Sequence, residues 1–379
     1  MKLAYVTPYV SEDIHAWSGS VYFVRRAMAG AGMRIFPIDD LREHGRISGK
    51  LKELGYKHFA GKRYIRNRED KVLDGYARQV EAALEDIRPD AVLSPGTVPI
   101  AHVKTDLPLA FWTDATFAGL TDFYPLFTNL CKRSAEAGRR MEQEALRRCS
   151  LAIYTSDWAA KSAIDNYDVD PAKVKVVPYG ANMASKLEAD DIDGHLSHKS
   201  YTCCKLLFLG VDWERKGGAV ALEAARVLNG LGLRTELHVV GCEPPGPVPD
   251  FVVRHGFVSK ETKAGVALLD KLLTEAHFLI VPSRAECYGL VYAEASSYAL
   301  PSLAAEVGGV PTVVKNGVNG RLFPLAARGE EYAEFIGGLM GSRDNYEQLC
   351  RSSFTEFKKR LNWGVAGAEV AGLLRGLVE

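Results

Sequence analysis

Apolar runs alternate with amphipathic stretches along most of the chain. Runs typical of β-strands occur in the first half at 2–8, 91–96, 109–116, 151–156 and 173–180. Helical periodicity falls between them, over 20–31, 76–87 and 133–149. Strands that are apolar throughout and separated by helices are typical of parallel sheets that helices cover on both faces. The first half therefore predicts a doubly wound α/β domain.

The same alternation restarts near residue 205. Further strands are expected at 205–210, 236–242, 277–283 and 301–306. Helices are expected at 218–230 and 261–275, from about Leu290, and over 330–340, 344–359 and 363–377. The polar stretch 179–202 has no period, which favours a linker there. Two doubly wound, Rossmann-like domains are therefore predicted, facing each other across a cleft in which ligands bind beyond the carboxyl ends of the strands.

The composition is that of an ordinary globular protein and excludes several classes of function. The 379 residues suit two domains, and 47 basic residues balance 47 acidic ones, so no global field attracts nucleic acid. Seven scattered cysteines form no C-x-x-C pair, which indicates reduced thiols rather than disulfides or a zinc site. The chain opens without a signal-peptide pattern and has no run of about 18 apolar residues. A cytoplasmic protein is expected.

The stretch RAECYGLVYAEAS (284–296) places two glutamates around an expected strand–loop–helix junction. Glu286 lies in the loop, and Glu294 lies in the first turns of the helix that follows. Amides at a helix start bind anions, and a carboxylate accepts hydrogen bonds from a vicinal diol. The combination fits a nucleotide sugar. A glutamate that favours its helix N-terminus and a solvated loop charge would give the same spacing.

A second segment has the charge that a diphosphate requires. In FLGVDWERKGG (208–218), Arg215 and Lys216 follow a strand and precede glycines that permit close approach of the backbone. Two adjacent cations suit a diphosphate, because the planar guanidinium of arginine donates paired hydrogen bonds to phosphate oxygens. For this segment alone, a solvated pair of loop charges is the alternative.

Together these segments resemble the retaining GT-B glycosyltransferases of the large E-x7-E family (glycosyltransferase family 4-like). The resemblance is carried by WSGS (17–20), FWTDATF (111–117), SDWAA (156–160), KVKVVPYGAN (173–182), G-x4-R-K-G (210–217), the E-x7-E pair and AEVGGVPTVVKNGVNGRLFP (305–324). These motifs cover nearly the whole chain. The resemblance implies an acceptor-side domain over 1–184, a donor-binding domain over 185–360, and a C-terminal helix over 361–379 that packs back on the N-terminal domain.

The resemblance also implies roles for individual residues. Glu286 would bind hydroxyls of the donor sugar, Glu294 would bind the ribose diol, and Arg215 and Lys216 would neutralise the departing diphosphate. Backbone contacts to the donor are implied for Gly19, Cys287, Tyr288, Gly289, Leu290 and Val291. A contact with the nucleobase is implied for Phe257 and Val258, in HGFVSK (255–260).

Three positions depart from the family's pattern. Val211 stands where many members have arginine, which leaves more of the phosphate charge to Arg215, and Thr312 stands where glutamate is frequent. The segment around Asp114 lacks a histidine that many members have. Asp114 is therefore either a base or ligand for the acceptor hydroxyl, or a loop carboxylate that caps the next segment. No D-x-D or histidine cluster has convincing metal-ligand spacing, so neither an essential metal ion nor another cofactor is expected.

The expected activity is transfer of a hexose-type sugar, with retention, from a UDP-, GDP- or ADP-sugar to an acceptor hydroxyl, in the synthesis of a glycan, glycolipid or glycoconjugate. A sugar-nucleotide epimerase of the same fold and a catalytically silent nucleotide-binding protein are the alternatives. A phosphorylase is disfavoured because no cofactor-bearing lysine site is found. A nicotinamide-dependent oxidoreductase is disfavoured because the first strand–turn lacks G-x-G-x-x-G.

A basic run in the first domain is a further candidate for binding. Residues 42–71 contain ten Lys or Arg and four acids, a net charge of +6. Such a run favours anionic lipids, and hence weak peripheral contact with a membrane, or an acidic or lipid-linked acceptor. A solvated pair of helices on the domain surface is the alternative.

Overall fold

The computed structural model describes residues 1–44 and 46–378, which form two compact units. Unit 1 comprises Met1–Tyr179 and Trp363–Glu379, and unit 2 comprises Gly180–Asn362. The division falls slightly before residue 184, so most of the predicted linker belongs to unit 2. Within that stretch lie the short helices η5 (Ala189–Asp191) and α7 (Ile192–Ser197), which the polar pattern did not predict.

Unit 1 is built on a six-stranded parallel sheet with the order β2-β1-β3-β4-β5-β6. Its strands are β1 (Lys2–Val6), β2 (Arg34–Ile38), β3 (Ala91–Ser94), β4 (Leu109–Thr113), β5 (Leu151–Tyr154) and β6 (Val174–Val176). The inner strands β3, β4 and β5 are buried at every position, which explains why they form continuous apolar runs. The sequence pattern did not predict the edge strand β2, which is partly exposed and contains Pro37.

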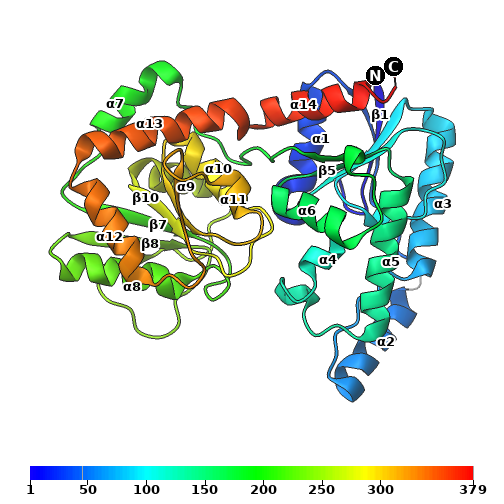
Figure 1. The fold of residues 1–379 in the computed structure, drawn as a ribbon, viewed down its shortest axis with the longest axis horizontal. Coiled ribbons are helices and arrows are strands. Elements are labelled where there is room, and N and C mark those ends of the chain that lie inside the picture. Colours follow the sequence, from blue (N-terminus) through cyan, green and yellow to red (C-terminus); the bar gives the residue numbers. More distant parts are fainter. Residues whose placement is uncertain (45, 379) are drawn as a thin grey trace. The chain divides into compact units, whose positions relative to one another are not determined.

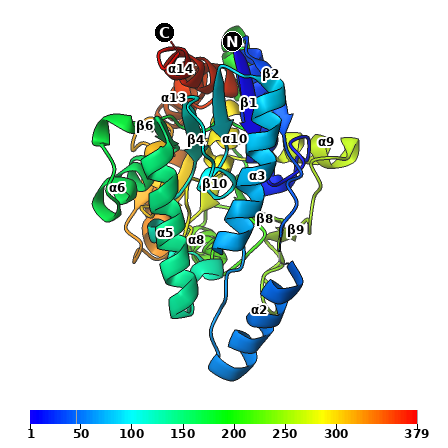
Figure 2. The same cartoon turned by 90° about the vertical axis from the view of Figure 1, so that its right-hand side faces the viewer.

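Helices cover the sheet of unit 1 (Figure 1). They are α1 (Ser20–Gly30), α2 (Arg46–Ala60), α3 (Asp70–Ile87), α4 (Phe117–Leu120), α5 (Lys132–Arg148), α6 (Asp157–Asn166) and α14 (Trp363–Arg375), with the 3-10 turns η1 (Ala16–Gly19), η2 (Val98–Ile100), η3 (Pro125–Phe127) and η4 (Pro171–Lys173). Most bury one stripe, as α5 does with Met141, Ala145 and Leu146. The helix α2 is the exception, since it projects from the rest of unit 1 in both views (Figures 1 and 2).

The C-terminal helix α14 packs against α1 within unit 1 (Figure 1). At its start the ring of Trp363 stacks on Phe23 with centroids 6.0 Å apart, and meets Trp112 at 5.6 Å. A Cβ on Gly367 would lie only 2.7 Å from the carbonyl oxygen of Ala27. The two helices therefore approach closely because position 367 has no side chain.

Unit 2 is built on a second six-stranded parallel sheet, with the order β12-β11-β10-β7-β8-β9. Its strands are β7 (Cys204–Leu209), β8 (Thr235–Val240), β9 (Val252–Arg254), β10 (Phe278–Val281), β11 (Ser302–Ala305) and β12 (Gly320–Phe323). Its longer helices are α8 (Gly218–Gly230), α9 (Lys263–Glu275), α10 (Leu290–Ser297), α12 (Gly329–Met340) and α13 (Arg343–Arg360), and α11 (Val310–Val313) is a single turn. Because β7 and β10 are parallel neighbours, the loops after them leave the sheet at the same edge.

None of the helices that the structure describes combines the length and the apolar character needed to span a bilayer.

Candidate functional site

Glycines bring the loop after β7 against the end of β10. Gly217 has a φ of +76°, and a Cβ there would lie 2.1 Å from the carbonyl oxygen of Pro282. A Cβ on Gly210 would lie 2.7 Å from Cγ of Lys216. Only glycine tolerates both the positive φ and the close approach at 217. The loop that contains Arg215 and Lys216 is thereby fixed beside the loop 282–289.

Glu286 is the centre of a cluster of charges on these two loops. The ammonium of Lys216 contacts its Oε2 directly, Nη1 of Arg215 lies 3.7 Å from the same oxygen, and Ser283 Oγ donates to it at 3.4 Å. The side chains of Glu286, Arg215 and Lys216 are each only 12% exposed. Arg215 also lies 3.7 Å from Asp212 through its Nε, so two cations are balanced by two carboxylates, of which the more exposed Asp212 is the more weakly coupled.

Arg215 is also held by the backbone around it. Its Nη1 donates to the carbonyl oxygen of Ala285 at 3.0 Å, and its own carbonyl accepts from the amide of Arg284 at 2.7 Å. Its amide donates to Asp212 Oδ1 at 3.0 Å. The guanidinium is therefore oriented before any ligand arrives, which is the arrangement that electrostatic catalysis requires.

The helix α10 begins immediately after this cluster. Gly289 caps it with a φ of +91°, and a Cβ there would lie 2.4 Å from the ring of Tyr292. The hydroxyl of Tyr292 donates to the carbonyl oxygen of Val281 at 2.7 Å, and burial raises the pKa of this tyrosine, so it stays a donor. In an α-helix the first amides lack an acceptor four residues earlier, and here these are the amides of Leu290 and Val291. The start of α10 thus adds donors beside Arg215.

Glu294 is paired with Lys260, a residue for which the sequence suggested no role. Their Nζ and Oε1 atoms lie 2.5 Å apart, and Glu294 is buried. Lys260 belongs to the segment after β9, whose Gly256 carbonyl accepts from the amide of Gly241 at the end of β8. Phe257 follows directly and is largely exposed. The predicted base-binding segment HGFVSK, which ends at Lys260, therefore lies beside Glu294, and its final lysine was a signal of charge but not of this partner.

The two predicted site residues of unit 1 lie at the carboxyl edge of its own sheet. Gly19 has a φ of +88° and lies two residues after Trp17, whose ring would lie 2.7 Å from a Cβ on Gly96 after β3. Asp114 follows β4 directly and is half-buried. Val211 is exposed and Thr312 is buried at the positions where the sequence departs from the family's pattern.

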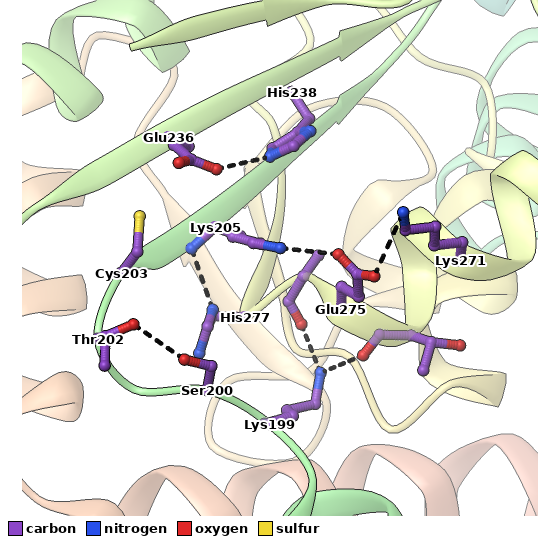
Figure 3. A network of polar contacts seen from close by, with 12 residues as sticks. Lys199, Ser200, Thr202, Cys203, Lys205, Glu236, His238, Lys271, Glu275 and His277 are labelled. Carbon is purple, nitrogen blue, oxygen red and sulfur yellow. Dashed lines mark hydrogen bonds and ion pairs between the residues drawn. The ribbon is translucent and has the colours of Figure 1, made fainter.

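A second polar network lies at the opposite end of β7 (Figure 3). Lys205 forms an ion pair with Glu275 at 2.7 Å, and its amide donates to Nδ1 of His277 at 3.0 Å. Lys199 donates to the carbonyl oxygens of Thr274 and Ala276, at the end of α9. Burial lowers the pKa of His277 to about 4 and that of Lys199 to about 8. These contacts fix α9 to the amino end of the sheet and are separate from the Glu286 cluster.

Among the described residues, no group of three or more His, Cys, Asp or Glu side chains is arranged to hold a metal ion.

In the comparison with known proteins, the match to a protein family falls within unit 2. Residues 203–342 match the family described as Glycosyl transferases group 1. A D-inositol 3-phosphate glycosyltransferase from Geodermatophilus obscurus is 30% identical over 217 residues, which cover 54% of this chain and 48% of that protein. One from Mycolicibacterium vanbaalenii is 26% identical over 196 residues, which cover 48% of this chain and 44% of that protein. The chain thus spans about half the length of the curated relatives it matches.

Solved structures match both units. Sucrose-phosphate synthase from Thermosynechococcus elongatus has a TM-score of 0.67 at 16% identity and covers 100% of this chain and 99% of its own. WaaG, a glycosyltransferase involved in lipopolysaccharide biosynthesis, has a TM-score of 0.66 at 14% identity, with 99% and 100% covered. HepE from Anabaena, solved in complex with UDP-glucose, has a TM-score of 0.65 at 16% identity, with 99% and 100% covered. The chain therefore has the GT-B fold, as the resemblance in its motifs predicted, and its residues 203–342 match the group 1 glycosyltransferases.

Proposed function

We propose that the chain is a retaining glycosyltransferase that moves a hexose-type sugar from a nucleoside-diphosphate sugar to an acceptor hydroxyl. The observation that carries this proposal is the contact of Lys216 and Arg215 with Glu286 beside the start of α10. It combines charge for a diphosphate with a carboxylate for sugar hydroxyls. The UDP-glucose bound to HepE supports the donor class, because that protein shares the fold.

The donor's parts follow the order of the site residues. In this proposal Glu286 binds hydroxyls of the sugar, assisted by the amides of residues 287–289. The diphosphate lies against Arg215, Lys216 and the first amides of α10. Glu294 binds the ribose diol in place of Lys260, and the base lies along 257–258. Gly19 would contact the phosphates, as the family resemblance implies. Asp114, which follows β4 directly, is the candidate base or ligand for the acceptor hydroxyl.

Chemistry at this site is a displacement at the anomeric carbon. The bond from that carbon to the phosphate oxygen breaks, which leaves positive charge on the sugar and negative charge on the diphosphate. Arg215, Lys216 and the α10 amides stabilise the leaving group, a contribution of about 10²–10³ in rate for each such contact. The acceptor oxygen forms its bond on the same face, and its proton passes to the departing phosphate oxygen. Because two cations serve the diphosphate, we propose that no divalent ion is essential, so EDTA should leave the rate unchanged.

The test is a donor screen that needs no acceptor. UDP-, GDP- and ADP-sugars are compared by the shift they cause in the melting temperature and by slow release of nucleoside diphosphate, measured by chromatography. One donor should stabilise the protein and be hydrolysed. Lys216→Ala should abolish most of the release, about 10²–10³-fold.

Lys205→Ala is the matched control, since this lysine also forms an ion pair but at the opposite end of β7. It should change release by less than about threefold, because it lies away from the reacting atoms. Absence of stabilisation by every donor would contradict the proposal, and equal losses in both lysine variants would contradict the site. Conversion of the donor to an epimeric nucleotide sugar would instead favour the epimerase.

A further inference from the structure

The helix α2 carries its apolar face outward. Leu51, Leu54 and Phe59 are 65%, 53% and 95% exposed. Their spacing of i, i+3 and i+8 places them on one side of an α-helix. Such a stripe normally faces the core, as the buried stripe of α5 does. A Cβ on Gly55, on the same side, would have nothing within 4 Å.

The opposite face of α2 is the one that packs on unit 1, and it is small or polar. The ring of Tyr56 stacks on Tyr64 with centroids 5.2 Å apart and planes 4° apart. A Cβ on Gly49 would lie 3.0 Å from Cδ of Arg66. Lys52, at the border of this face and next to Phe59 around the helix, forms an ion pair with Glu69 at 2.7 Å. These contacts fix the orientation of α2, so the outward leucines and phenylalanine are a property of the fold.

Positive charge surrounds the apolar side chains. Lys50 and Lys57 are exposed on the flank of the stripe, and Lys62 and Arg63 are exposed just beyond the end of α2. Glu53, on the helix itself, is 3.5 Å from Arg66. An apolar stripe with flanking cations is the pattern of a helix that lies in the interface of an anionic bilayer.

A second segment extends this surface. Asn129 donates through Nδ2 to the carbonyl oxygen of Gly61 at 2.8 Å, and accepts from Lys62 at 2.7 Å. The backbone of Arg63 pairs with the same segment. Leu126, a few residues before Asn129, is also exposed. The segment 129–131, far from α2 in the sequence, therefore pairs with the residues just after α2.

We propose that α2 docks unit 1 onto an anionic lipid bilayer. Leu51, Leu54 and Phe59 lie among the upper acyl carbons, and Lys50 and Lys57 lie at the level of the lipid phosphates. The docking surface is separate from the Glu286 cluster and does not depend on the proposed activity. Its occupant is a membrane rather than a second copy of the chain, because exposed cations flanking the stripe would repel the same cations of a partner copy.

Co-sedimentation with vesicles tests the proposal. The intact protein is mixed with phosphatidylcholine vesicles, and with vesicles in which about 30% of the lipid is phosphatidylglycerol. It should pellet with the anionic vesicles, less so at about 0.5 M salt, and weakly with the neutral ones. In a Phe59→Trp variant, the tryptophan fluorescence that remains after the wild-type spectrum is subtracted comes from residue 59. Its emission maximum should move to shorter wavelength only with anionic vesicles, which reports insertion rather than contact alone.

Two groups of variants separate the two contributions. Lys50→Gln with Lys57→Gln should weaken binding about fivefold for each charge removed. Leu51→Ser with Leu54→Ser and Phe59→Ser should weaken it more than about tenfold. All these side chains are exposed, so the melting temperature should stay that of the wild type. Leu231→Ser is the matched control, because Leu231 is 74% exposed at the end of α8 in unit 2.

Three results would overturn the proposal. One is equal sedimentation of the serine variant and the wild type. Another is failure of the wild type to bind anionic vesicles. The third is concentration-dependent dimerisation that the serine substitutions abolish without any binding to vesicles, which would assign the face to a second copy.

Discussion

Glu286→Gln is the substitution that best separates the two tasks of the charge cluster. The glutamine is nearly isosteric, but it removes the negative charge that Lys216 contacts and that lies 3.7 Å from Arg215. Breaking a fully buried ion pair costs about 3–5 kcal/mol, because a charge is left without its partner. Here the cations keep some access to water, so we expect a loss of about 2–3 kcal/mol. For a unit of this size that corresponds to a fall of roughly 5–10 °C in melting temperature.

Binding and catalysis should respond in opposite ways. Without Glu286 the two cations are less neutralised, so affinity for a nucleoside diphosphate should be unchanged or up to about tenfold tighter. Transfer should fall about 10²–10³-fold in kcat/KM, because the carboxylate that orients the sugar is lost. Calorimetric titration with the diphosphate and steady-state rates with the full donor measure the two quantities separately.

Asp212→Asn supplies the matched control. Its carboxylate also lies 3.7 Å from Arg215, but on the Nε side and with more exposure. It should change transfer by less than about tenfold. If the diphosphate affinity of Glu286→Gln falls in proportion to its rate, the reasoning is refuted, since Glu286 would then only hold the loop in place.

Three further substitutions test other parts of unit 2. Glu294→Gln should raise KM for the donor about tenfold or more and change kcat less than about threefold, because the ribose lies away from the reacting bond; a loss confined to kcat would contradict this role. Burial lowers the pKa of His277 to about 4. Between about pH 6.5 and 4 its imidazole is therefore protonated in the unfolded chain but neutral in the folded protein. The free energy of unfolding, measured by urea denaturation, should therefore fall by up to about 3 kcal/mol from pH 6.5 to 4. In the His277→Asn variant this fall should be smaller, and the same dependence on pH in both proteins would exclude the effect. Gly217→Ala introduces a Cβ 2.1 Å from the Pro282 carbonyl at a φ of +76°, so it should cost about 2–4 kcal/mol, and a variant with the wild-type melting temperature would show that the loop relaxes freely.

The fold was predictable from sequence where strands are buried on both faces. The inner strands β3, β4, β5 and β10 are buried at every position and are continuous apolar runs. The three strands that the pattern did not predict, β2, β9 and β12, all lie at sheet edges. Edge strands are covered on fewer sides, so β9 and β12 mix buried with exposed positions and span only three and four residues. The run of apolar residues that identifies a strand in the sequence is therefore shortest in these edge strands, because fewer of their side chains are buried.

The candidate site was predictable where its residues lie on loops after neighbouring strands. Arg215 and Glu286 are far apart in sequence, but β7 and β10 are adjacent in the sheet. The parallel topology alone therefore places their loops at one edge. Lys260 was not predictable in the same way, because its contact with Glu294 depends on the path of the chain between β9 and α9. The outward face of α2 was hidden too, since a periodic pattern gives the width of an apolar stripe and not the direction in which it points.

The E-x7-E spacing acquires a physical meaning from the partners of the two glutamates. Glu286 contacts Lys216, and Glu294 contacts Lys260. Each carboxylate thus holds a lysine in place. Without that carboxylate the lysine would be repelled by a neighbouring cation or would lie partly buried without a partner. Under the proposed function, a donor brings hydroxyls to the two glutamates and a diphosphate to Arg215 and Lys216, and charge-assisted hydrogen bonds replace these ion pairs. Little reorganisation is then required when the leaving group develops its charge, which is the condition under which fixed cations contribute most to the rate.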